Sequence, residues 1–375
     1  MKKKFSLKKF LLLLILICIF QYQYFRRTQR LNRLNNLQNI LKFLKQDYTL
    51  DDLSCVSRLD LNSPKINDEI LLSLIELPSL KLLDLSHSNI TNQGTIFLKN
   101  LNSLEILYLN DTNINNLEFL ENLENLTYLD LSRTSIKDSS LIHFKSLKNL
   151  KTLRIDETEI GDQGVKYIHQ FCKEMSRFSL SYTNITQKGV VYISDLKSLS
   201  VLDLEGTGIQ GKSIEPISKL PQLFALNISS FLKSPSREKR AKGFLGYEIN
   251  EIKYLSSLPK LSILKITCLE YISEISSLNK MNNLTTLSID WPSFSESDLK
   301  KILDLPKLTK IYINLVSDNL DGTFSDLNLR KERRLYLKEK EATKKQRNTE
   351  ISIIYDRFYF DFLFHRVRPK MPFEK

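Results

Sequence analysis

The sequence predicts an α/β solenoid, with a curved parallel sheet on a concave face and short helices on a convex face. Two observations predict this fold. An eleven-residue pattern, LxxLxLxxTxI, recurs through the chain, and its copies start at a nearly constant spacing. Self-similarity at a period of about 20–50 residues is typical of stacked repeats, each of which buries its apolar face against its neighbours.

Eleven copies of the pattern keep this register. They start at Val56, Leu80, Leu104, Leu126, Leu150, Met175, Leu199, Leu223, Leu261, Leu284 and Leu308. Nine of the ten steps between them are 22–25 residues long, and the remaining step, from Leu223 to Leu261, is 38 residues. So many registered copies do not arise from composition alone.

The first half of each copy predicts a short strand with one buried face. Residues alternate within LxxLxL, so Leu80, Leu83 and Leu85 face the core, as does Ile90 after the strand. The threonine that follows each strand can supply its hydroxyl to the turn backbone, whose polar groups need partners inside the protein. These threonines are Thr112, Thr134, Thr158, Thr183 and Thr207.

The second half of each copy predicts a short helix. Asp68, Asp138 and Asp162 lie where a helix N-cap is expected, and an apolar-periodic segment such as VKYIHQF follows. The 22-residue copy has less room, so we expect a shorter helix there. Strands stack about 4.8 Å apart, so eleven repeats give a sheet on the order of 50 Å long.

These copies resemble the leucine-rich repeat family. The resemblance is carried by LKLLDLSHSNITNQG, LTYLDLSRTSIKDSS, LKTLRIDETEIGDQG, MSRFSLSYTNITQKG and LSVLDLEGTGIQGKS. It covers residues 56–316, about 70% of the chain. The commonest family form has Asn or Cys where this chain has Thr. The Thr variant, followed by IxDxG, resembles repeats of many bacterial proteins and of some F-box-associated proteins, but no F-box-like segment precedes the repeats here.

The first 25 residues are typical of a targeting segment. Five lysines precede an uninterrupted apolar run from Phe10 to Phe20, and no small residue follows the run before Arg26. We therefore expect an uncleaved signal anchor that crosses the membrane through residues 10–25, with the repeats on the non-cytoplasmic side. The alternatives are a cleaved signal peptide and a secreted protein, lipidation at Cys18, or an ordinary N-terminal core helix.

Solenoids need caps at both ends, because their end repeats expose the core. Residues 26–55 predict an amphipathic N-terminal cap helix, with leucines at 31, 34, 37, 41 and 44 on one side. Residues 317–375 are basic and aromatic, and predict a C-terminal cap or tail. Their alternating Phe358, Phe360, Phe362 and Phe364 indicate a strand that packs on the last repeat or binds a membrane or partner.

Composition argues against several function classes. The net charge of +12 lies at the chain ends, because residues 51–316 carry thirty basic and thirty-two acidic side chains. Nucleic-acid binders concentrate positive charge on the folded binding face, so we expect no nucleic-acid partner. The four cysteines and four histidines form no ligand-spaced group, and no catalytic motif occurs. We expect no enzyme activity, metal, cofactor or small-molecule substrate.

The outward strand positions form the candidate interaction face. Acidic groups predominate there in the first seven repeats, with aromatic and small polar residues between them. We expect this face to lie in solvent and to bind a protein of basic or hydrogen-bonding character, with the aromatics as anchors. The candidate residues are Asp84, Tyr108, Asn110, Asp111, Tyr128, Asp130, Arg154, Asp156, Tyr182, Asp203, Glu205 and Trp291.

The 38-residue step contains a basic insertion near residues 231–246. Arg237, Lys239, Arg240 and Lys242 lie within it. Insertions in repeat proteins become loops, often on the binding face, although a solvated loop without a function is equally consistent. The function expected overall is a membrane-anchored or exported repeat protein that binds a protein partner. The alternatives are a structural spacer of the cell envelope without a defined ligand, and a secreted bacterial effector.

Overall fold

The computed structural model describes residues 7–43, 53, 55–207, 209, 211–229, 252–266, 278, 280–291, 302, 304–315 and 352–354. Its strands are β1 Arg58–Asp60, β2 Leu82–Asp84, β3 Ile106–Tyr108, β4 Tyr128–Asp130, β5 Thr152–Arg154, β6 Arg177–Ser179, β7 Val201–Asp203, β8 Ala225–Asn227, β9 Ile263–Ile266, β10 Thr286–Trp291, β11 Lys310–Leu315 and β12 Ser352–Ile354. The α-helices are α1 Leu7–Phe43, α3 Asp68–Leu74, α4 Asn92–Thr95, α5 Asp162–Phe171 and α6 Gln187–Ile193. Tighter 3₁₀ helices are η1 Leu98–Asn100, η2 Glu118–Asn122, η3 Asp138–Ser146, η4 Gly211–Lys219 and η5 Ile252–Ser257.

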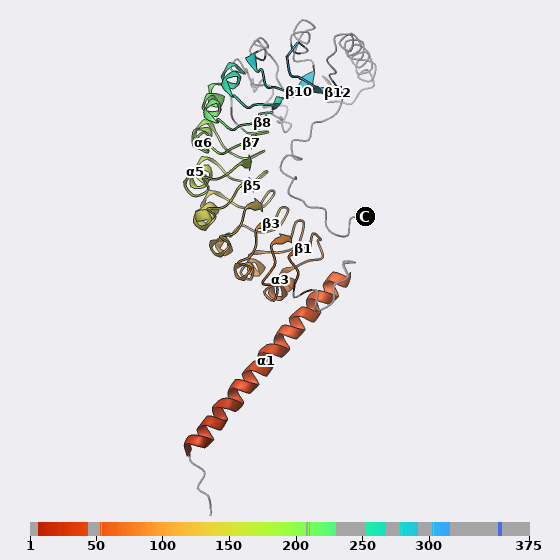
Figure 1. Ribbon diagram of the computed structural model, residues 1–375, viewed down its shortest axis with the longest axis vertical. Helices are drawn as coiled ribbons and strands as arrows, with labels where there is room; N and C mark the ends of the chain where they lie inside the picture. Colours follow the sequence, from red (N-terminus) through yellow and green to blue (C-terminus); the bar gives the residue numbers. More distant parts are fainter. Residues whose placement is uncertain are drawn as a thin grey trace, which may run out of the picture.

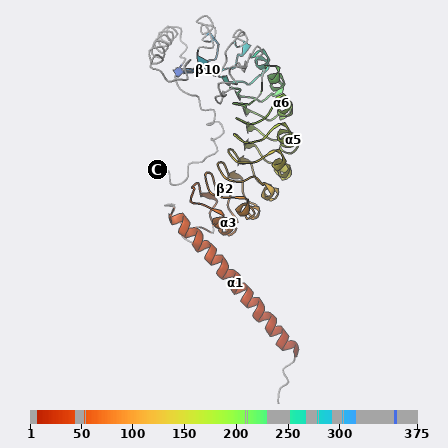
Figure 2. The same cartoon turned by 180° about the vertical axis from the view of Figure 1, so that it is seen from behind.

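The repeats form the predicted solenoid. All twelve strands join one parallel sheet in chain order, from β1 to β12. The strands line the inside of an arc and the helices line its outside (Figure 1), an arrangement that is also clear from behind (Figure 2). Eleven strands come from the repeats. The twelfth, β12, lies in the predicted C-terminal cap and pairs with β11 of the last repeat.

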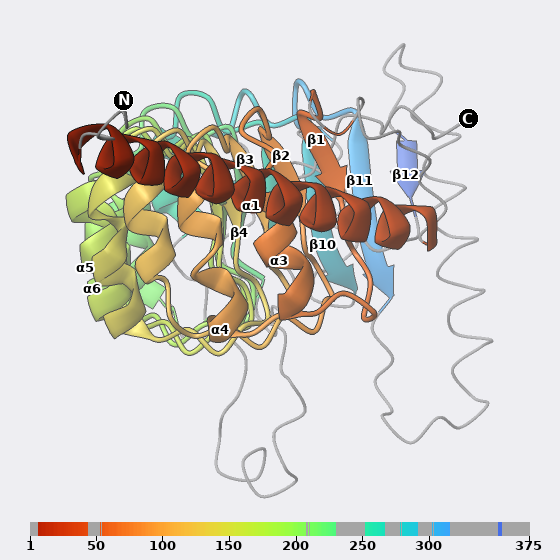
Figure 3. The ribbon, with the colours of Figure 1, turned by 90° about the horizontal axis from the view of Figure 1, so that it is seen from below.

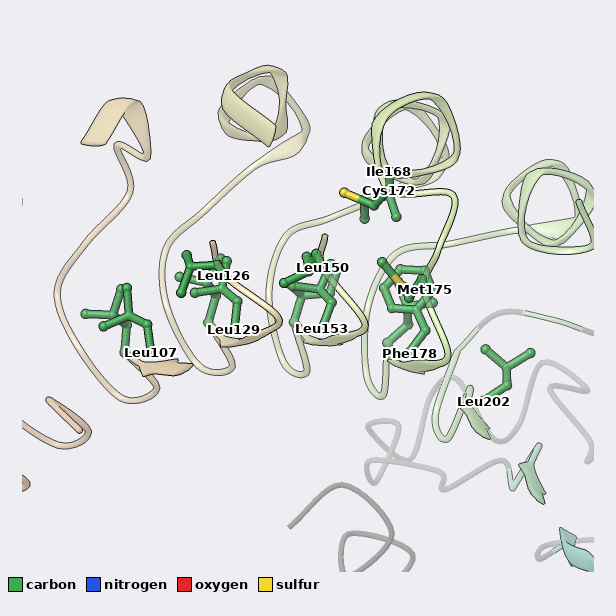
Figure 4. Packing of buried hydrophobic residues seen from close by; sticks show 14 of the residues in the cluster. Leu107, Leu126, Leu129, Leu150, Leu153, Ile168, Cys172, Met175, Phe178 and Leu202 are labelled. Carbon is green, nitrogen blue, oxygen red and sulfur yellow. The ribbon is translucent and has the colours of Figure 1, made fainter. Parts of the chain in front are cut away.

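The leucines of the pattern build one continuous core. Leu80, Leu83, Leu85 and Ile90 are fully buried, as predicted. In the middle of the arc, one apolar strand side chain follows another from repeat to repeat, with Ile168 and Cys172 on their helix side (Figure 4). These strand residues are Leu107, Leu129, Leu153, Phe178 and Leu202. Because the side-chain layers run between repeats rather than within one, no repeat has a separate core.

The predicted role of the repeat threonines is confirmed. The hydroxyl of Thr112 donates to the carbonyl oxygen of Leu109 at 2.6 Å, and the hydroxyl of Thr158 donates to that of Ile155 at 2.7 Å. Thr134, Thr183 and Thr207 make the same bond, as does Ser88 in the second repeat. Each hydroxyl therefore satisfies a carbonyl that the turn would otherwise leave buried without a partner.

The repeat aspartates act differently from the N-cap role that the sequence predicted. Asp68, Asp138 and Asp162 are the first helical residues, and their carboxylates bind the following repeat. Asp162 accepts hydrogen bonds from the N–H of Thr186 at 2.8 Å, the hydroxyl of Thr186 at 2.6 Å and the N–H of Gly189 at 2.9 Å. A Cβ on Gly189 would lie 2.7 Å from Asp162 Oδ1, and one on Gly164 would lie 2.6 Å from Asp138 Oδ1, which explains why glycine recurs at this position of the repeat. Chain spacing alone does not show this partnership, because the two groups belong to different repeats.

Convex helices do not vary in length simply with repeat length. The 22-residue copy has the five-residue η2, but the 24-residue copy that starts at Leu80 has the four-residue α4 and the three-residue η1, so the expected link between a short repeat and a short helix does not hold. The 24- and 25-residue copies carry longer helices where their apolar periodicity allows, as in α5 with ten residues.

The predicted N-terminal segment and the predicted cap helix are continuous in one helix. α1 runs unbroken for 37 residues, because no Gly or Pro interrupts residues 7–43. Its C-terminal part packs on α3 (Figure 3), where Leu34, Leu37 and Leu41 are buried and Arg33 Nε donates to Glu76 Oε1 at 2.8 Å. This part covers the first repeat, as a cap must. The rest of α1 extends away from the arc.

Among the residues searched, which are those that the structure describes, no helix combines the length and apolarity needed to span a membrane.

Removing the Asp162 carboxylate tests the link between repeats. We expect Asp162→Ala to lower the free energy of unfolding by about 2–4 kcal/mol, because three hydrogen bonds to the next repeat are lost. Gly189→Ala should be destabilising in the wild type and much less so in the Asp162→Ala background, because the atom that its Cβ would meet is gone. Urea denaturation measures both. Exposed Glu174→Ala is the matched control, and additive effects of the two substitutions would contradict the proposed contact.

Candidate interaction face

Most of the predicted contact side chains on the concave surface of the strands are buried, contrary to the exposure that the sequence predicted. We call this surface the strand face. Neighbouring strands bring its side chains into contact with one another, as in Tyr108 and Tyr128, whose ring centroids are 4.8 Å apart. Eight of the twelve candidate residues are nearly inaccessible. They are Asp84, Tyr108, Asn110, Tyr128, Asp130, Arg154, Asp156 and Asp203.

The aspartate in the middle of LxL closes the end of its own strand. Asp84 Oδ1 accepts the N–H of Ser86 at 2.9 Å, and Asp130 Oδ1 accepts the N–H of Ser132 at 3.0 Å. Asp60, Asp203 and Asn227 make the same contact two residues on. A short side chain with an acceptor oxygen satisfies the backbone N–H at the point where the hydrogen bonds between strands end. These residues therefore have a structural role that the sequence analysis missed, although the recurrence of Asp or Asn at this position was a usable signal.

Arg154 and Asp156 organise the middle of the strand face. Arg154 Nη2 donates to Asp156 Oδ2 at 2.8 Å, and Arg154 Nε lies 3.7 Å from Asp130 Oδ2. The other oxygen of Asp156 accepts the N–H of Ser181 at 2.9 Å and the hydroxyl of Ser179. Burial raises the pKa of Asp130, and the charge of Arg154 opposes that shift. One guanidinium thus balances two buried carboxylates.

A row of residues in the left-handed conformation follows the strands at the edge of the concave face. We call it the left-handed row, and it consists of His87, Asp111, Arg133, Glu157 and Tyr182, with φ between 53° and 58°. Gly206 takes the same position in the next repeat, with φ of 66°. Each residue donates its N–H to a carbonyl of the following repeat, for example Glu157 to Ser181 at 2.8 Å. The conformation therefore extends the inter-repeat hydrogen bonds beyond the strands.

The side chains of the left-handed row are more accessible than the strand face. Those of His87, Arg133 and Glu157 are 51%, 44% and 39% exposed. Arg133 Nη2 donates to Asp111 Oδ2 at 2.6 Å, and this bond lowers the pKa of Asp111. His87 Nδ1 lies 3.2 Å from the same oxygen, and Arg133 Nη1 lies 3.7 Å from Glu157. Asp111, Arg133 and Glu157 alternate in charge along three repeats, and the imidazole of His87 lies beside the first of them.

Beyond the row, Asp203 is a buried carboxylate with no ion pair among the described residues. It is fully buried beside Asp156 and Glu205, and its pKa is raised to about 7, mainly by desolvation and then by those two negative charges. Lys265, whose charge opposes this shift, donates to Glu205 Oε2 at 2.7 Å. Tyr182 donates its hydroxyl to Glu205 at 3.0 Å, and burial raises the pKa of that phenol. The Tyr182 ring lies over Gly206, where a Cβ would come within 2.4 Å of it.

The remaining predicted residues, Trp291 and those of the basic insertion, lie partly or wholly outside the part of the chain that the structure describes. Trp291 ends β10, but its side chain is not among the described groups. Arg237, Lys239, Arg240 and Lys242 of the insertion lie outside the described residues. Within the described part of the chain, no group of three or more His, Cys, Asp and Glu residues could hold a metal ion.

A family model described as "Leucine Rich repeat" matches residues 76–98 and 146–168. The chain is a leucine-rich repeat protein. A comparison with curated protein sequences found no match.

Solved structures show similar leucine-rich repeat folds. A leucine-rich repeat protein of Leptospira interrogans is 23% identical, with a TM-score of 0.50 over 70% of this chain and 61% of that chain. An internalin of Listeria monocytogenes is 18% identical, with a TM-score of 0.44 over 78% of this chain and 91% of that chain. The ectodomain of the Arabidopsis receptor kinase HAESA, solved with a peptide hormone ligand, is 17% identical, with a TM-score of 0.46 over 70% of this chain and 40% of that chain.

The raised pKa of Asp203 makes the stability of this leucine-rich repeat protein pH-dependent. Between about pH 4 and 7 the folded state holds a proton that the unfolded state has lost, so the contribution of Asp203 falls as pH rises. Asp203→Asn keeps the oxygen that accepts the Glu205 N–H and removes the charge. We expect it to raise the free energy of unfolding at pH 8, by up to about 4 kcal/mol, and to leave it nearly unchanged at pH 4.

Urea denaturation at pH 4, 6 and 8 measures this effect. Asp84→Asn is the matched control, because it makes the same change at the same strand position in another repeat. An Asp203→Asn protein whose stability follows the wild-type pH curve would show that the buried carboxylate is compensated.

Proposed function

We propose that this is a non-enzymatic protein that binds another protein on its concave side, with the left-handed row as the main contact. The fold supports an interaction role, because a solenoid presents one long concave surface and leucine-rich repeat domains generally mediate protein interactions. The observation that carries the proposal is the row itself: five accessible or partly accessible side chains on backbone that favours glycine.

The left-handed row lowers the stability of the fold relative to glycine at the same positions. A left-handed conformation costs an L-residue roughly 1–2 kcal/mol, less for Asp and His than for Arg, Glu and Tyr. Gly206 makes the same inter-repeat hydrogen bond as its row neighbours, so the fold requires the conformation but not the side chain. Backbone strain that a protein retains is characteristic of functional sites. We therefore assign the contact with a partner to the side chains of Arg133, Glu157 and Tyr182.

The buried strand face has a supporting part in this proposal. Tyr108 packs on Tyr128, and Arg154 pairs with Asp130 and Asp156, so contacts between repeats hold the strands that lead into the row. Two of the candidate residues predicted from sequence, Asp111 and Tyr182, belong to the row, and Glu205 touches it. The proposed contact thus lies at one edge of the face that the sequence indicated.

Site-specific photo-crosslinking in the producing cell tests the proposal. We expect p-benzoylphenylalanine at position 157 to give a discrete adduct with one protein, at least tenfold more abundant than the adduct from position 142. Ile142 is a matched control, because its side chain is similarly exposed on the convex helix η3. Equal adducts at the two positions would contradict a concave-side contact. Absence of any adduct at both would favour the spacer role, which the internal Asp111–Arg133 pairing already suits.

We also propose that the outer part of α1 holds the protein at a membrane, with the repeats on the non-cytoplasmic side. If this segment is cleaved, the repeats would instead be secreted. Ile19, Phe20, Tyr22, Tyr24 and Phe25 are all 47–70% exposed on the part of α1 that extends away from the arc. Exposed apolar surface of this extent is characteristic of membrane or protein contact. The lysines before the apolar run and the arginines after it are charged flanks of the kind found at membrane interfaces.

Cell fractionation tests this localisation. We expect the full chain in the membrane fraction, resistant to extraction with 1 M salt but released by detergent, and a chain lacking residues 1–25 in the soluble fraction. α1 residues that cap the first repeat, from Arg30 onward, are retained in the truncated chain, so its fold should persist. Equal recovery of both proteins in the soluble fraction would exclude the membrane proposal.

A further inference from the structure

Two arginines on the outer part of α1 carry charge that no described carboxylate compensates. Arg26 and Arg27 are exposed, and neither forms an ion pair within the described part of the chain. The helix itself supplies no acidic side chain, because the first acidic residue of the sequence is Asp47. Exposed cations of this kind attract an anionic partner.

The next arginines along α1 differ, because they already have a partner in the fold. Arg30 Nε lies 3.2 Å from Glu76 Oε2, and Arg33 Nε donates to Glu76 Oε1 at 2.8 Å. Arg26 lies one helical turn before Arg30, on the same side of α1. The first repeat thus pairs with the arginines that reach it, and the charge of Arg26 and Arg27 remains for a partner outside the described part of the chain.

Exposed aromatic side chains lie immediately before these two arginines. Phe20, Tyr22, Tyr24 and Phe25 are 60–70% exposed, and the guanidinium carbon of Arg26 lies 5.7 Å from the centroid of the Tyr22 ring. They follow the apolar run that begins the chain. Apolar, aromatic and cationic residues therefore succeed one another along one unbroken helix. Hydrocarbon, interface and headgroups succeed one another in the same order in a lipid leaflet.

The length of this segment fits the membrane interface. A helix rises 1.5 Å per residue, so Arg27 lies about 10 Å beyond Phe20 along α1. The polar region of one leaflet is roughly 5–8 Å thick, and the tilt usual for membrane helices shortens the projected length of the segment toward that value. A helix that leaves the hydrocarbon near Phe20 brings its arginines to the headgroups. A lipid surface accounts for the aromatics and the cations together, whereas an acidic protein segment accounts for the cations alone.

We propose that Arg26 and Arg27 bind the phosphate groups of anionic phospholipids, with the aromatic side chains before them seated in the membrane interface. This inference rests on the proposed membrane localisation and names the class of lipid that the protein contacts there. Arginine suits a phosphate because its planar fork donates two parallel hydrogen bonds. The contact also holds the first repeat close to the membrane, since Arg33, which pairs with Glu76, lies only about 9 Å beyond Arg27 along the helix.

Competition between two vesicle populations tests the proposal. The full chain in detergent is diluted into an equal mixture of phosphatidylcholine vesicles and vesicles that contain about 30% phosphatidylglycerol, one population being biotinylated for separation. We expect the chain to favour the anionic vesicles. Arg26→Gln with Arg27→Gln should lower this preference roughly fivefold or more, because each arginine near an anionic surface is attracted to it. The N-terminal lysines are present in every variant, so the difference between variants reports the two arginines alone.

The matched control is Lys166→Gln with Lys173→Gln, which removes the same charge from exposed positions in and after α5. It should keep the preference of the wild type, and thermal unfolding confirms that each variant is folded. Equal distribution of the wild type between the two populations would overturn the proposal, as would a doubly substituted Arg26 and Arg27 variant with unchanged preference. In both cases the chain still floats with vesicles. A wild type that floats with neither population would instead contradict the proposed membrane localisation, so the two failures are distinguishable.

Discussion

Each repeat of this protein completes its hydrogen bonds only with the next repeat. The strands pair with the following strand, the left-handed row donates its N–H groups one repeat on, and Asp162 on the convex side binds the backbone and hydroxyl of Thr186. The core follows the same rule, because its leucines stack between repeats. This dependence explains why the period is so constant: a repeat of another length must still place its strand, its row residue and its helix start beside those of its neighbour.

The same spacing governs the concave face. Parallel strands lie about 4.8 Å apart, so outward side chains of neighbouring strands contact one another. Polar residues there either pair with a neighbour or remain unsatisfied. Arg154 with Asp130 and Asp156 shows the first outcome. Asp203, next to two other carboxylates, shows the second. The net charge of the face is therefore the charge that remains after this pairing, rather than the number of its acidic residues.

How far the sequence predicts the structure depends on whether the partner of a residue belongs to its own repeat. In LEILYLNDTNI, Leu104, Leu107 and Leu109 are recognisable as core because they alternate, and Thr112 as a turn residue because its acceptor is three residues away. The N-cap role predicted for Asp162 was wrong, because its partners are Thr186 and Gly189 in the next repeat. The exposure predicted for Tyr108 and Tyr128 was wrong for the same reason. Each side chain points away from the core of its own strand, but each is buried in the assembled sheet.

By itself the sequence determined the solenoid, the register of its eleven repeat strands, the buried leucines and the threonine-closed turns, since these follow from periodicity and from contacts within a repeat. Only the tertiary structure decided which polar residues are accessible, that α1 is continuous from the first repeat outward, and that five large side chains occupy left-handed backbone. The physical reason is that these features arise where repeats meet. Burial, charge compensation and backbone conformation at such a place depend on two or three repeats together, and no single repeat carries that information.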